Sequence, residues 1–134
     1  MQDFTLHPRL VADTAFVTDW MLSRVLLMDD MRYPWVILVP RRPHLVELFD
    51  LTKPDRALLV EGIARAAQCL KTTSGATKIN VGALGNQVPQ LHVHVVARQD
   101  GDTAWPGPVW GHSPRVPYQA AARNAWIARF LNSS

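Results

Sequence analysis

Two histidines, His92 and His94, stand one residue apart in a segment that alternates apolar and polar side chains. Successive side chains of a strand point to opposite faces, so a strand here places Gln90, His92 and His94 on one face. The apolar positions form the other face: Leu91, Val93 and Val95. Paired imidazoles can pass protons near neutral pH, and a neutral histidine can attack phosphorus to form a covalent nucleotidyl-imidazole. The residue types alone leave three roles open for the pair: catalytic, metal-binding or structural.

The segment 90–96 (Gln-Leu-His-Val-His-Val-Val) resembles the histidine-triad motif, in which three histidines alternate with apolar residues and two more apolar residues follow. Gln90 stands where the first histidine of that motif would be. Three other stretches support the resemblance and occur in the order expected for the family: 33–41 (Tyr-Pro-Trp-Val-Ile-Leu-Val-Pro-Arg), 78–82 (Lys-Ile-Asn-Val-Gly) and 85–89 (Gly-Asn-Gln-Val-Pro). Together the four stretches span the middle of the chain.

The resemblance implies a mechanism and assigns roles in it. His92 corresponds to the middle histidine, the nucleophile that takes up the nucleoside monophosphate, and His94 corresponds to the third, which contacts the phosphate and assists charge or proton transfer. The first histidine supports their hydrogen bonds, whereas Gln90 can donate and accept but cannot become cationic. We therefore expect the nucleophile to be in place and Gln90 to alter the rate and pH profile. No cofactor and no metal is implied.

Further residues are expected to bind the substrate. Asn80, Asn86 and Gln87 match positions that reach the phosphate in the family, with Asn86 replacing a glutamine and Gln87 replacing a serine or threonine. An acidic residue after the first core strand binds the ribose hydroxyls in related proteins; of Asp29 and Asp30, the sequence slightly favours Asp29. Asn80, Asn86 and the two aspartates also have a structural alternative, because short amides and carboxylates often bond backbone groups in turns and at strand ends.

The elements that position these residues follow from hydrophobic periodicity and from breaks by proline and glycine. Thr52 predicts the start of a long helix and Ser74-Gly75 its end. The expected strands cover 23–28, 35–39, 77–82 and the histidine segment 87–98. An irregular ordered loop is expected over 99–117 and a final helix from about 118 to 131. The chain is therefore expected to form one domain over 1–134 of the α+β class, an antiparallel sheet with a long helix packed across it.

Composition limits the class of protein. The 134 residues, 48% hydrophobic and 19% charged, are typical of one soluble globular domain. The start of the chain has no secretory signal, no apolar run is long enough to span a membrane, and the single Cys69 fits a reducing compartment, so we expect a cytoplasmic protein. The net charge of +3 is too small and too scattered to indicate nucleic-acid binding.

The remaining aromatic and histidine residues carry weaker signals. The segment 105–110 resembles a tryptophan- and proline-rich tail that closes over the active site in some relatives. The five tryptophans also suit a homodimer interface, with core packing as the alternative for Trp20, Trp35 and Trp126. His44 is expected to have a supporting or structural role. The two others, His7 and His112, are expected at the surface or in loops.

Taken with the resemblance, these residues predict a nucleotide-binding hydrolase or nucleotidyl transferase that acts at the α-phosphate through His92. Nucleoside phosphoramidates, dinucleoside polyphosphates and aminoacyl adenylates are the expected substrates. Two alternatives remain open at this point: a nucleotide-binding protein with little turnover, and a metal-binding His-x-His protein of a different fold.

Overall fold

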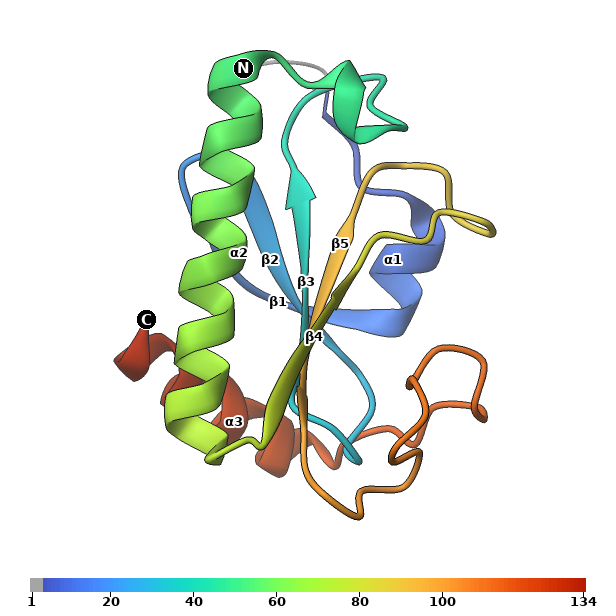
Figure 1. The fold of residues 1–134 in the computed structure, drawn as a ribbon, viewed down its shortest axis with the longest axis vertical. Helices are drawn as coiled ribbons and strands as arrows, with labels where there is room; N and C mark the ends of the chain where they lie inside the picture. The colour runs from blue at the N-terminus through green and yellow to red at the C-terminus, as the bar shows by residue number, and fades with distance from the viewer. Residues whose placement is uncertain (1–3) are drawn as a thin grey trace.

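The computed structural model describes residues 4–134 and contains a five-stranded antiparallel sheet (Figure 1). In spatial order its strands are β1 (Thr14–Asp19), β2 (Ser23–Met28), β3 (Trp35–Pro40), β5 (Val93–Arg98) and β4 (Lys78–Gly82). The helices are α1 (Pro8–Asp13), α2 (Lys53–Ser74) and α3 (Ala120–Ser133), with a short 3-10 helix, η1 (Leu48–Asp50). The predicted α+β class is confirmed. Residues 1–3 lie outside the described residues. They belong to the predicted domain 1–134 and to the start of the chain, where no secretory signal is expected.

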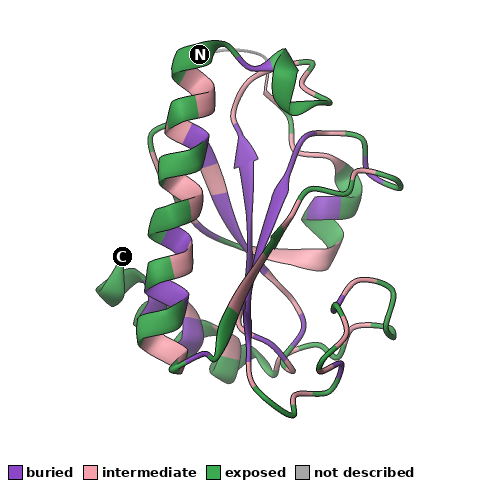
Figure 2. Cartoon of the chain, viewed as in Figure 1, coloured by how far each residue is buried: buried purple, intermediate pink, exposed green. Residues whose placement is uncertain are grey.

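The centre of the sheet is buried on both faces. Every residue of β3 and of β5 is buried, as the nearly continuous apolar run at 35–39 predicts (Figure 2). Strand β5 pairs with β3 on one side and with β4 on the other, so Val93–Arg98 lies inside the sheet. The expected strand over 87–98 is thus observed only in its second half, and His92 directly precedes it. A central strand holds its side chains more rigidly than a loop, which suits residues that need fixed positions.

Helix α2 crosses one face of the sheet (Figure 1). The Thr52 side chain accepts a hydrogen bond from the backbone N–H of Asp55, and Gly75, with a φ of 66°, ends the helix in the left-handed conformation. The buried face of the helix consists of Leu59, Ala66, Cys69 and Leu70. It packs against the apolar face of the histidine strand, where Leu91, Val93 and Val95 belong to the same core cluster.

Helix α3 packs beside α2 at this core. Trp126 stacks on Phe130 with ring centroids 5.4 Å apart, and Trp20 stacks on the other side of Phe130 at 6.1 Å. The Cys69 thiol donates to the Phe130 carbonyl over 3.3 Å, so this cysteine is a core residue. These tryptophans pack within the protomer. No helix within residues 4–134 is long and apolar enough to cross a bilayer.

The opposite face of the sheet carries a second apolar cluster and is flanked by α1 and by the irregular segment 99–117 (Figure 1). Helix α1 was not among the expected elements. It has only six residues, but His7 caps it, since His7 Nδ1 accepts a hydrogen bond from the Arg9 backbone N–H, and Pro8 fits its first turn. Strand β1 follows α1 directly and was also not expected.

Candidate active site

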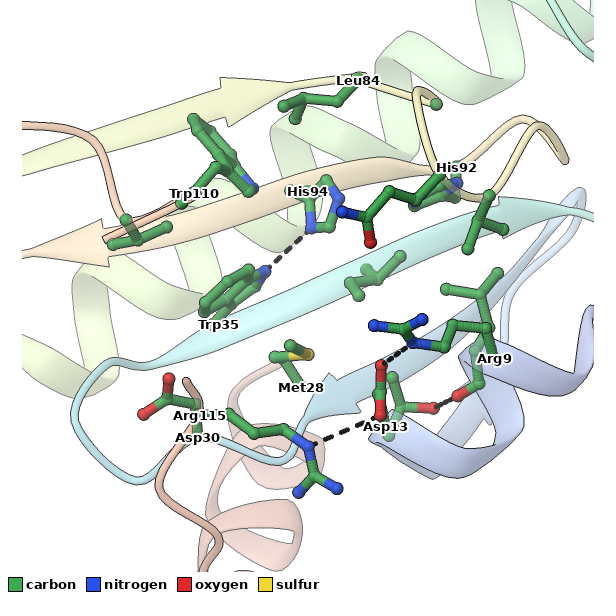
Figure 3. A pocket seen from close by; sticks show the side chains of 18 of the residues that line it. Arg9, Asp13, Met28, Asp30, Trp35, Leu84, His92, His94, Trp110 and Arg115 are labelled. Carbon is green, nitrogen blue, oxygen red and sulfur yellow. Dashed lines mark hydrogen bonds and ion pairs between the residues drawn. The ribbon is translucent and has the colours of Figure 1, made fainter. Parts of the chain in front are cut away.

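A pocket of about 510 Å³ opens on the sheet face opposite α2 (Figure 3). Strands β2, β3 and β5 form its floor with Met28, Trp35, Ile37 and His94, and His92 lies at its side. Helix α1 supplies one wall, and the loops 84–88 and 109–115 supply the others. The pocket is therefore assembled from regions that are far apart in the sequence.

The backbone of the histidine segment fixes the tautomer of His92. Its Nδ1 lies 2.7 Å from the carbonyl oxygen of Gln90. A carbonyl oxygen can only accept, so the proton of the neutral ring is on Nδ1 and the lone pair is on Nε2. The Leu91 N–H, in turn, donates to the Leu45 carbonyl over 3.0 Å and holds this stretch of backbone. A histidine with a free Nε2 lone pair is a competent nucleophile.

His94 has the opposite tautomer because of Trp35. The indole Nε1–H of Trp35 donates to His94 Nδ1 over 3.0 Å. An indole nitrogen can only donate, so His94 Nδ1 is the acceptor and the ring proton is on Nε2. The sheet register produces this contact: Ile37 lies opposite His94 and Trp35 opposite Val96, which makes Trp35 and His94 diagonal neighbours on one face.

The two imidazoles lie side by side, with ring centroids 4.9 Å apart (Figure 3). Burial, reinforced by the neighbouring His92, lowers the pKa of His94 to about 3. His94 is thus a neutral N–H donor at pH 7, in agreement with the bond from Trp35. The pair combines one nitrogen that can attack and one N–H that can donate to an anion.

Trp110 covers the site beside His94. Its ring lies over Gly82, where a Cβ atom would meet the ring carbon Cη2 at 3.0 Å. Gly82 is paired with His94 across β4 and β5, and the His94 and Trp110 ring centroids are 5.6 Å apart. The absence of a side chain at Gly82 therefore allows Trp110 to pack edge-on against the imidazole. Trp110 reaches this position from its own chain.

The structure brings some of the expected binding residues to the pocket and directs others elsewhere. Asn86 and Gln87 line it. Asn80 does not: its Oδ1 accepts from Arg98 Nη1 over 3.0 Å, and Arg98 is buried and bound on its other side to Asp102. Hydrogen bonding by Arg98 holds the pKa of Asp102 below its usual value, so this pair stays charged. Asn80 thus holds Arg98 at the β4–β5 edge.

Gln90 is also directed away from the pocket. Its Oε1 accepts from the His7 backbone N–H over 2.8 Å, and its Nε2 donates to the Thr5 carbonyl over 2.9 Å. Both bonds hold the segment that leads into α1. The amide at the first triad position therefore anchors the α1 wall.

Of the two candidate aspartates, Asp30 lines the pocket and Asp29 does not. Asp29 accepts from the Tyr118 backbone N–H over 3.0 Å and pairs with Arg115 at 3.2 Å, so its carboxylate faces the segment that precedes α3. Asp30 is buried and pairs with Arg32 at 2.8 Å. Burial, with added effects of Asp30 and Asp29, raises the pKa of Tyr118 to about 12.

An ion-pair chain at the pocket rim was not expected from the sequence. Asp13 pairs with Arg9 at 3.1 Å and with Arg115 at 3.5 Å, and all three residues line the pocket (Figure 3). Arg9 and Asp13 come from α1. The sequence indicates this helix only through His7, which can cap it, and Pro8, which suits its first turn.

The other histidines lie outside the pocket lining. His7 caps α1, while His44 and His112 are exposed. Within residues 4–134, no three side chains of His, Cys, Asp or Glu come together in a way that could hold a metal ion.

Comparisons with known proteins find similar sequences and similar folds. The family model described as the HIT domain matches residues 9–101. The chain is 45% identical to a histidine triad protein from Sinorhizobium meliloti, over 98% of each chain and with a TM-score of 0.97. It is 44% identical to a histidine triad protein from Bradyrhizobium japonicum, over 97% of each chain and with a TM-score of 0.94. A third such protein, from Marinobacter aquaeolei, is 42% identical over 97% of this chain and 95% of its own, with a TM-score of 0.95. A search of curated proteins finds no match.

Proposed function

The chain belongs to the histidine triad family, whose members are generally nucleotide-binding hydrolases or transferases, and from this we propose that it cleaves the α-phosphate bond of a nucleotide through His92. The observation that carries the proposal is the hydrogen bond from His92 Nδ1 to the Gln90 carbonyl, which leaves Nε2 free to attack. Nucleoside phosphoramidates and dinucleoside polyphosphates are the proposed substrates.

The reaction has two steps. In the first, His92 Nε2 forms a bond to the α-phosphorus while the bond from phosphorus to the leaving oxygen or nitrogen breaks, and the leaving group takes a proton from solvent. In the second, water attacks the nucleotidyl-histidine and releases the nucleoside monophosphate, and the proton lost by water goes to solvent. If another nucleophile replaces water, the same intermediate gives transfer.

Donors around the phosphate support this chemistry, because charge moves onto its oxygens in each step. We assign His94 Nε2–H to a non-bridging oxygen, with the neutral ring set by Trp35 and by burial. The side-chain amides of Asn86 and Gln87 line the same pocket and supply further donors. Asn80 was also expected to be such a donor, but it bonds Arg98 and does not line the pocket.

The remainder of the nucleotide fits the other end of the pocket. Leu10 and Met28 offer an apolar place for the base, and Asp30, which lines the pocket, is proposed at the ribose in place of Asp29. Gln90, as the first residue of the variant triad, is proposed to act by seating α1. The reaction needs no metal in this scheme. We further propose a cytoplasmic homodimer with a small nucleotide, and not nucleic acid or a membrane, as its partner.

Chromatographic product analysis tests the proposal. The wild type and His92→Ala are incubated with adenosine phosphoramidate and with diadenosine tetraphosphate, with and without chelator. We expect chelator-resistant release of nucleoside monophosphate by the wild type and a loss of at least about a thousandfold in His92→Ala, which lacks the nucleophile.

His44→Asn is the matched control, because His44 is an exposed histidine with a φ of 62°, a conformation that asparagine tolerates. It should retain wild-type turnover. Full turnover by His92→Ala would rule out the nucleophile, and nucleotide binding without turnover by the wild type would indicate a binding protein.

A further inference from the structure

The ion-pair chain at the pocket rim lies beside the place proposed for the base. Asp13 is the last residue of α1, and its carbonyl oxygen accepts from the Asp29 backbone N–H over 3.0 Å. The next residue, Thr14, pairs with Met28 across β1 and β2, so Asp13 adjoins the Met28 floor of the pocket. Strand β3 separates β2 from β5, so these two strands are about 10 Å apart. A nucleoside monophosphate with its phosphate at His92 can span this distance and place its base at the α1 wall.

Arg9 and Asp13 lie side by side on α1 and line the same pocket (Figure 3). One carboxylate oxygen of Asp13 accepts from Arg9 Nε over 3.1 Å, and the other lies 3.5 Å from Arg115 Nε. A carboxylate has about four lone-pair sites, so both oxygens can still accept from a ligand. Among the residues that the structure describes, none accepts from the terminal amino groups of Arg9. The pair therefore offers a guanidinium donor next to two carboxylate acceptors.

This order of donor and acceptors matches one of the two purine bases. The base-pairing edge of guanine carries, one after another, the O6 acceptor, the N1–H donor and the N2 amino donor. Arg9 can donate to O6 while the two oxygens of Asp13 accept from N1–H and from the N2 amino group. Adenine has an amino group in place of O6 and a bare ring nitrogen in place of N1–H. Its amino group would therefore face a donor, and its ring nitrogen would face a carboxylate.

We propose that Arg9 and Asp13 select guanine, so that the preferred substrates are guanosine nucleotides rather than adenosine nucleotides. The inference rests on the proposed function, in which the α-phosphate lies at His92 and the base lies at the α1 wall. Arg115 contacts the second oxygen of Asp13 and so holds the carboxylate in place before the base arrives. A positioned pair of this kind discriminates between bases by the donors and acceptors that it leaves unpaired.

Steady-state kinetics with matched substrates test this. Guanosine 5′-phosphoramidate and adenosine 5′-phosphoramidate have the same reacting bond and the same sugar and differ only in the base. We expect kcat/KM of the wild type to be about thirtyfold higher for the guanosine compound, as a bidentate base contact discriminates to about this extent. Equal values, or a preference for adenosine, overturn the inference and leave the proposed function in place. Absence of turnover with both compounds and with the diguanosine and diadenosine tetraphosphates overturns both.

Asp13→Asn changes which base the pair recognises. The amide oxygen can still accept from N1–H, but the amide N–H groups oppose the N2 amino group of guanine and suit the C2 carbonyl of xanthine. We expect the ratio of kcat/KM for guanosine to that for adenosine phosphoramidate to fall about tenfold, and kcat/KM for xanthosine 5′-phosphoramidate to rise about fivefold over the wild type. A merely damaged protein would lose turnover with all three compounds, so the rise with xanthosine separates base contact from a structural effect.

Arg9→Leu removes the donor to O6 from a side chain that is 61% exposed, and should lower the guanosine-to-adenosine ratio about fivefold. Asp19→Asn is the matched control, because Asp19 also pairs with two arginines, at 2.9 and 4.0 Å, but does not line the pocket. It should retain the wild-type ratio. A wild-type ratio in Asp13→Asn or in Arg9→Leu overturns the inference, and the nucleophilic role of His92 is unaffected by that result.

Discussion

His94 illustrates how one side-chain contact can set the chemistry of a site. Its Nδ1 accepts from an indole that cannot accept in return, so protonation of His94 on that nitrogen requires the Trp35 bond to break. Burial acts in the same direction. A histidine that is usually able to become cationic near neutral pH is here a fixed, neutral donor.

This neutral state has a consequence for stability. The unfolded chain has a histidine of ordinary pKa, 6.5, whereas in the folded protein the pKa of His94 is lowered to about 3. Between these values protons bind preferentially to the unfolded state, so stability is fully present above pH 6.5 and falls as the pH decreases toward 3. The slope is about 1.4 kcal/mol for each pH unit within that window. Chemical denaturation of the wild type from pH 7 to pH 4 measures it.

His94→Asn provides the comparison, since an asparagine Oδ1 can still accept from Trp35 but the side chain does not titrate. The difference in unfolding free energy between wild type and variant should shrink as the pH falls. If the two proteins instead lose stability in parallel over this range, His94 is not the group responsible.

At the scale of elements, the pocket depends on how α1 is held. Gln90 bonds two backbone groups of the residues that precede α1, and α1 provides Arg9, Leu10 and Asp13 to the pocket. The segment 90–92, which carries the candidate nucleophile, therefore also positions the opposite wall. A histidine at this position offers one donor and one acceptor in a different geometry, so it is not an equivalent anchor.

Gln90→Ala should lower the free energy of unfolding by about 1–2 kcal/mol, because the His7 N–H and the Thr5 carbonyl lose their partners. Urea denaturation measures this, and nucleotide titration of the same variant should show weaker binding as the α1 wall loosens. Gln68→Ala, an exposed glutamine on α2, is the matched control and should behave as wild type. If Gln90→Ala and Gln68→Ala have the same free energy of unfolding, Gln90 does not anchor the segment before α1.

The elements that the sequence predicts well are those with a strong, sustained pattern. Strand β3 is an unbroken apolar run, and α2 combines a capping threonine, helical spacing and a terminal glycine. In contrast, α1 and β1 mix apolar and polar residues over six positions each, so neither an apolar run nor a sustained periodicity marks them in the sequence. The loop residues Asn86 and Gln87 reach the pocket because the loop adjoins the histidines.

Two side chains that were expected at the site bond partners that are distant in sequence. Asn80 bonds a residue 18 positions away, and Gln90 bonds residues 83 and 85 positions away. The role of Trp35 also depends on a distant residue. Its apolar run predicts a core residue, and only the register of β3 and β5 places it diagonal to His94. Such contacts depend on tertiary packing, which local patterns do not encode.

At the scale of the whole molecule, the two edges of the sheet differ. Strand β1 has a register irregularity between Phe16 and Thr18, a feature that disfavours pairing with another strand. Strand β4, at the other edge, pairs regularly with β5 and exposes Val81. Val81 lies opposite Val95, on the face that α2 covers. The proposed homodimer therefore fits best with contact through β4.

Sedimentation velocity tests this arrangement. We expect wild-type protein to sediment as a dimer and Val81→Lys to weaken the association by about 3 kcal/mol, because a buried lysine would lack a partner. Met21→Lys changes an exposed apolar residue in the turn between β1 and β2 and should remain dimeric. A monomeric wild type, or a dimeric Val81→Lys, would contradict association through this edge.

The anchoring of residues 5–7 by Gln90 also bears on how the protein should be prepared for experiments. A purification tag added at the amino-terminal side lies on the same stretch of chain as Thr5 and His7, which seat α1 against the pocket. Behind Ser134 it would instead follow α3, which packs beside α2 on the far side of the sheet (Figure 1). Affinities measured with a tag at the amino-terminal end would therefore report on the fusion as well as on the protein, and the carboxyl-terminal end is the better place for it.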